Sequence, residues 1–99
     1  MQFAAPIERI WQFTKSIEQA AAVGEWEKAA ELANERSPLL MSLSAQQTDA
    51  ALEVLRQVHA IDMHVATTAQ SAQTALSAEY RTAMQATRNV NQYQRVAQF

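Results

Sequence analysis

A chain of 99 residues with a net charge of −2 holds one small domain at most, because so short a chain buries a limited core. Its eight basic and ten acidic residues form no basic stripe, which argues against nucleic-acid and anionic-membrane surfaces. The lack of cysteine excludes disulfides and thiolate metal sites, and no apolar run approaches the roughly 20 residues that span a bilayer. We therefore expect a cytoplasmic protein, and the single glycine and two prolines predict long helices.

The first predicted helix covers about residues 6–23 and begins at Pro6, whose missing N–H costs nothing in a first turn. Six of its residues recur at spacings of three and four and define one face that should be buried: Ile7, Ile10, Trp11, Thr14, Ile17 and Ala21. Gly24 follows as the residue after the helix end, where a positive φ is common and a Cβ atom is disfavoured. Trp26 then opens the buried face of the next helix, so we predict a short helical hairpin whose closed end is filled by this tryptophan.

The second predicted helix covers about residues 25–43 and should be kinked or broken near Pro38, which cannot donate a helical hydrogen bond. A third helix should run over residues 45–86, with Ser44 and Gln47 as a capping box at its start. Since about forty residues of helix span roughly 60 Å, twice the length of each earlier helix, its distal half should extend beyond them.

A short helical tail over residues 90–99 should follow a hinge at Asn89 and Asn91. Its apolar residues are spaced three apart, at Tyr93, Val96 and Phe99. The fold class predicted from these elements is all-α: an up-down-up antiparallel helical bundle with a long third helix and this tail, forming a single domain over residues 1–99.

The sequence holds no constellation of reactive groups, so we predict no enzyme, no cofactor and no metal site. His59 and His64 are the only histidines, and five residues of helix place them about 140° apart, which is wrong for a shared ion. Asp62 falls within the apolar stripe of the third helix and needs a polar partner there. Counting helix levels favours the Trp26 indole N–H, free amides at the start of helix two, or Lys28, and places Arg36 too far away.

Four apolar residues lie off the main stripes and are candidates for an interface with a partner: Phe13, Leu32, Leu39 and Met63. The two tryptophans fit core packing better than recognition, because both fall on helix faces that should be buried. Gly24, Trp26 and Asp62 are accordingly assigned structural roles.

The sequence resembles the FliT-type flagellar export chaperones. The resemblance depends on the opening helix, on "AAVGEWEKAAELANERSPLL", on "VLRQVHAIDMHV" and on the tail "NQYQRV". It implies a nucleotide-independent cytosolic chaperone that binds the C-terminal part of the filament-cap protein and delivers it to an export-gate component. A flagellar transcriptional regulator is a second partner in some relatives.

The residues themselves suggest where such a client would bind. The distal face of the third helix is apolar but mostly small, and its uncovered part suits helix-in-groove recognition. We predict a client groove of Val65, Ala69, Ala72 and Leu76, covered by Tyr93, Val96 and Phe99 of the tail when it is empty. The main alternative is a structural protein, a helical homodimer that buries the same face without a client.

Overall fold

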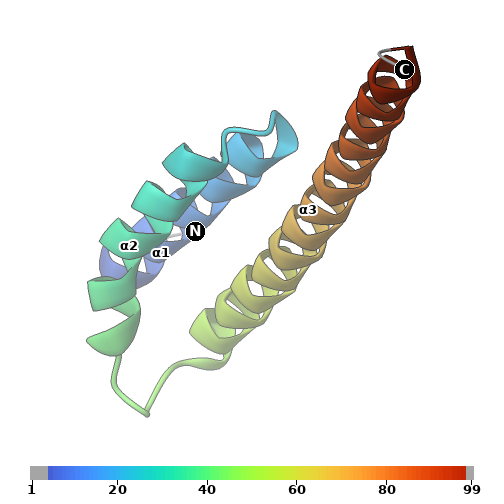
Figure 1. Cartoon of the computed structure of the whole chain (residues 1–99). Coiled ribbons are helices and arrows are strands. Elements are labelled where there is room, and N and C mark those ends of the chain that lie inside the picture. The colour runs from blue at the N-terminus through green and yellow to red at the C-terminus, as the bar shows by residue number, and fades with distance from the viewer. Residues whose placement is uncertain (1–4, 98–99) are drawn as a thin grey trace. The chain divides into compact units, whose positions relative to one another are not determined.

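The computed structural model describes residues 5–97 of the chain, with side chains described as far as residue 86, and most of these residues are helical. Helix α1 covers Ala5–Ala22, α2 covers Trp26–Met41 and α3 covers Asp49–Ala97, and the described residues include no strand (Figure 1). This confirms the all-α fold. The chain forms two compact units, Met1–Ala69 and Gln70–Phe99, and the single domain expected over residues 1–99 stays a prediction.

The core of the first unit lies along one face of α1, where the residues at positions 7, 10, 14, 17 and 21 are all buried. Ile17 and Ala20 pack with Ala29 of α2, and the small side chains of the two alanines allow the helix backbones to approach closely. Trp11 and Trp26 were expected in this core, but both are half-buried at its edge. Side chains of their size do not fit between helices that meet through alanine.

The direction of α3 within the first unit follows from two contacts along its length. Asp62 meets Arg36, which also contacts Thr14, whereas one turn later Val65 packs against the cluster containing Ile17 and Ala29. Moving forward along α3 therefore moves forward along α1 and backward along α2. This is the up-down-up order that the sequence predicts.

Helix α2 continues through Pro38 to Met41, so the alternative of a break at this proline is wrong. The proline removes the hydrogen bond to the carbonyl of Asn34 but leaves its own carbonyl free to accept from the Ser42 N–H at 3.0 Å. Since Pro38 lies in the last turns of α2, few bonds depend on it, and the helix tolerates the loss.

Helix α3 begins four residues later than predicted, because Thr48 caps it. The Thr48 Oγ1 accepts a hydrogen bond from the Ala51 N–H at 3.1 Å, and the Thr48 carbonyl accepts the first helical bond from Leu52 at 2.9 Å. The expected capping box is absent: Ser44 and Gln47 contact each other in the preceding loop, where the Gln47 side-chain amide donates to the Ser44 carbonyl at 3.0 Å.

The second unit contains the later part of α3, which runs without interruption to Ala97. The hinge expected at Asn89 and Asn91 and the separate tail are therefore wrong at the level of the backbone. An asparagine costs a helix only some tenths of a kcal/mol, and no glycine or proline follows Pro38 to stop it. Every residue from 70 to 86 is exposed.

Candidate functional site

The turn between α1 and α2 is built around Gly24, whose φ is +76°. The Gly24 N–H donates to the Ala21 carbonyl at 3.1 Å and the Glu25 N–H donates to the Ala20 carbonyl at 2.9 Å, which is the hydrogen-bond pattern of a Schellman motif. A Cβ atom at Gly24 would meet no other atom within 4 Å. The requirement for glycine is therefore one of backbone conformation and not of space.

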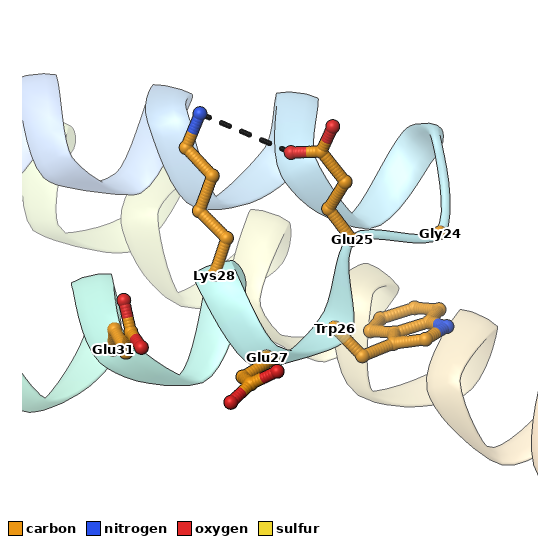
Figure 2. Close-up of a pocket in the computed structure, with 6 residues that line it drawn as sticks. All are labelled: Gly24, Glu25, Trp26, Glu27, Lys28 and Glu31. Atoms are coloured by element: carbon orange, nitrogen blue, oxygen red, sulfur yellow. Dashed lines mark ion pairs between the residues drawn. The ribbon is translucent and has the colours of Figure 1, made fainter.

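Trp26 is the first residue of α2, and its side chain extends from the hairpin end, away from Lys28 and Glu31 (Figure 2). It borders a shallow depression together with Gly24, Glu27 and other residues of the turn. Lys28 and Glu25 form a long ion pair of 3.8 Å at the start of α2. Trp26 thus flanks the turn at the surface, and it does not meet Asp62 as the sequence suggested.

A polar layer instead joins all three helices in the first unit. The Arg36 Nη1 donates to the Thr14 Oγ1 and to the Asp62 Oδ1, each at 2.9 Å. The Thr14 hydroxyl itself donates a hydrogen bond to the Ile10 carbonyl at 2.7 Å. With its side chain only 10% exposed, Arg36 depends on these partners, and its buried Nε has none among the described residues.

The prediction that Arg36 lies too far from Asp62 was wrong because it assumed a symmetric hairpin between α2 and α3. The seven residues that separate Met41 from Asp49 form an extended loop rather than a tight turn. Asp62 lies 13 residues beyond Asp49, about 20 Å along α3, whereas Arg36 lies only five residues before the end of α2. The long loop therefore displaces α3 along its axis, so that Asp62, and not an earlier residue of α3, lies level with Arg36.

Sequence reasoning placed Thr14 on the buried face of α1 and rejected Arg36 as a partner of Asp62, so it missed the layer that these residues form, although a signal for that layer exists. Arg36 follows buried Ala29 by seven residues, so helical spacing places it on the inner face of α2. Thr14 occupies an otherwise apolar face of α1. A cation, a hydroxyl and a carboxylate on three inward faces could have been matched with one another.

The structure brings together two of the four candidate interface residues. Phe13 and Leu32 line one depression between α1 and α2, and both are half-buried. Leu39 is also half-buried, while Met63 is 56% exposed on α3. Neither Leu39 nor Met63 lines that depression.

The four predicted groove residues are divided between the two units. Val65 is half-buried and packs against the Ile17, Ala20 and Ala29 cluster, and half-buried Ala69 ends the first unit. Ala72 and Leu76 belong to the second unit and are exposed, Leu76 by 65%. Two further apolar side chains continue this exposed stripe at four-residue spacing, Tyr80 and Met84. The predicted tail contacts of Tyr93, Val96 and Phe99 lie outside the described side chains.

The described residues form no cluster of metal-binding side chains. His59 and His64 are both exposed, and no group of three histidine, cysteine, aspartate or glutamate residues within the described part could hold a metal ion. Among the described helices, none is both long enough and apolar enough to cross a membrane.

Comparison with known proteins identifies the family from most of the chain. The model of the family described as Flagellar protein FliT matches residues 4–95. The chain belongs to the FliT family. FliT proteins are flagellar chaperones with a helical fold, in agreement with the three helices observed here. No curated protein and no solved structure gives a significant match to the chain.

Proposed function

We propose that this FliT protein is a cytosolic flagellar export chaperone that binds the C-terminal region of the filament-cap protein and delivers it to an export-gate component. Family membership over residues 4–95 is the observation that carries the proposal. The expectations of a nucleotide-independent, non-catalytic chaperone and of a flagellar regulator as a second partner belong to the same proposal.

The exposed stripe on α3 supports binding of an apolar client helix. Leu76 and Tyr80 are 65% and 66% exposed, and Met84 is 40% exposed. Ala72 precedes them on the same side of the helix, and small residues allow a client helix to approach the α3 backbone closely. We propose that the client contacts begin at Val65 and Ala69 and continue through Ala72 and Leu76.

Calorimetry with a C-terminal fragment of the cap protein tests this surface. The variant Leu76→Glu should weaken binding at least tenfold, because it places a charge where the client buries apolar surface. Ser71→Glu is the matched control: it adds the same charge to an exposed position about 140° around the helix, and its binding should be nearly unchanged. Equal effects of the two variants, or no binding by the unmodified chain, would refute the proposed surface.

We further propose that the last residues regulate this surface: when no client is bound, the continuous α3 helix opens near Asn89 and Asn91, and Tyr93, Val96 and Phe99 then cover the stripe. Deleting residues 89–99 should then tighten binding of the cap-protein fragment, since the client no longer competes with an internal segment. Unchanged or weaker binding in calorimetry would contradict occlusion.

Sedimentation of the same samples tests the alternative of a client-free homodimer. A monomer at micromolar concentration would exclude that alternative.

A further inference from the structure

A second surface, on the α1–α2 hairpin of the first unit, has the features of a docking site. Phe13 and Leu32 form its apolar walls, and Arg9, Gln12 and Ser16 complete the depression. Leu32 also packs against the buried cluster of Ile17, Ala20 and Ala29, so one wall is held by the core. The side chains available to a partner are therefore apolar and partly immobilised before it binds, which lowers the entropy cost of binding.

The charges around this depression indicate the chemistry of its partner. Arg9 is the one lysine or arginine in residues 5–69 without a carboxylate within ion-pair distance. The other four are paired, as Lys15 with Glu18, Lys28 with Glu25, Arg36 with Asp62 and Arg56 with Glu53. The Arg9 guanidinium lies instead over the Phe13 ring, 6.0 Å from its centroid, at the edge of the apolar walls.

A lone arginine beside two apolar side chains does not suit a nucleic acid or a phosphate-rich surface, which binds several cations together. It does suit a protein segment, because a guanidinium that rests on an aromatic ring keeps its N–H donors available to a carboxylate. On a helix, an apolar residue and a carboxylate three or four positions apart lie on the same side.

We infer that the Phe13–Leu32 depression binds an acidic amphipathic helix of a partner protein, whose apolar side chain lies between Phe13 and Leu32 and whose carboxylate pairs with Arg9. The surface shares no residue with the client stripe proposed on α3, and none of the contacts and charges that define it involves that stripe. The inference therefore holds or fails independently of the proposed client.

Nuclear magnetic resonance of the full chain with a defined probe tests the inference. The probe is a capped helical peptide of Leu-Ala-Ala-Glu repeats, and its uncharged match carries Gln in place of Glu. The acidic peptide should shift the amide signals of Phe13 and Leu32 and bind about fivefold more tightly than the Gln peptide. In the variant Arg9→Gln the two peptides should bind equally, because the pairing that separates them is lost.

Arg56→Gln is the matched control, since it removes an exposed arginine of α3 whose side chain is 73% exposed. This variant should keep the preference for the acidic peptide, which shows that the overall charge of the chain is not responsible. A preference that persists in Arg9→Gln, or signal shifts confined to residues 70–86, would overturn the assignment. So would the absence of any shift at Phe13 and Leu32.

Discussion

At the scale of single residues, Gly24 carries the most local information, because its φ of +76° is a conformation that L side chains rarely adopt. Gly24→Ala should lower the free energy of unfolding by about 1 kcal/mol, measured by urea denaturation. Gly24→Asn should lose less, since asparagine tolerates this conformation better than alanine. Because a Cβ atom meets no neighbour, a loss of several kcal/mol would contradict a purely conformational cause.

The polar layer of Thr14, Arg36 and Asp62 gives a second prediction at this scale. Asp62→Ala should cost about 2 kcal/mol of unfolding free energy, because it leaves the buried Arg36 guanidinium with a single acceptor. Adding Arg36→Met should recover much of the loss by removing the stranded charge.

A matched control for this layer is the exposed pair of Arg56 and Glu53, whose atoms are 3.1 Å apart. Glu53→Ala should change the unfolding free energy by less than about 0.5 kcal/mol, since solvent screens this pair. If Asp62→Ala cost no more than Glu53→Ala in the same denaturation experiment, the layer would contribute nothing beyond a surface contact.

At the scale of elements, variants at the start of α3 distinguish the observed cap, Thr48, from the predicted capping box of Ser44 and Gln47. Thr48→Ala should cost about 1 kcal/mol, because the Ala51 N–H loses its acceptor. Ser44→Ala should be nearly neutral, since its side chain bonds only within an exposed loop. The reverse order in thermal denaturation would restore the predicted capping box.

The helices could be predicted from the spacing of apolar residues and from the positions of glycine and proline. The register of α3 against α2 could not. The positive φ of Gly24 and the inward face of α1 follow from local backbone preferences, which the sequence shows directly. The pairing of Arg36 with Asp62 depends on the path of the loop before Thr48, which no local pattern determines. Similarly, Phe13 and Leu32 were identified as surface candidates, but only packing places them in one depression.

At the scale of the whole molecule, the two units differ in what stabilises them. The first unit buries apolar side chains of all three helices, among them Ile10, Ala29 and Val58. The second has only exposed side chains over residues 70–86, so its helix depends there on backbone propensity. Two threonines of this stretch, Thr74 and Thr82, donate to the carbonyl four residues earlier, an arrangement that slightly destabilises helices.

The protection of amides from hydrogen exchange should therefore fall along α3 near the boundary between Ala69 and Gln70. Amides of residues 52–65 should be protected with the free energy of global unfolding, whereas those of residues 74–86 should exchange after local opening that costs only a small part of it. Adding the cap-protein fragment should raise protection in residues 74–86, because a bound helix buries the stripe around Leu76 and Tyr80. Uniform protection along the free helix would mean that something already covers this stripe, and the client surface would have to be sought on the first unit instead.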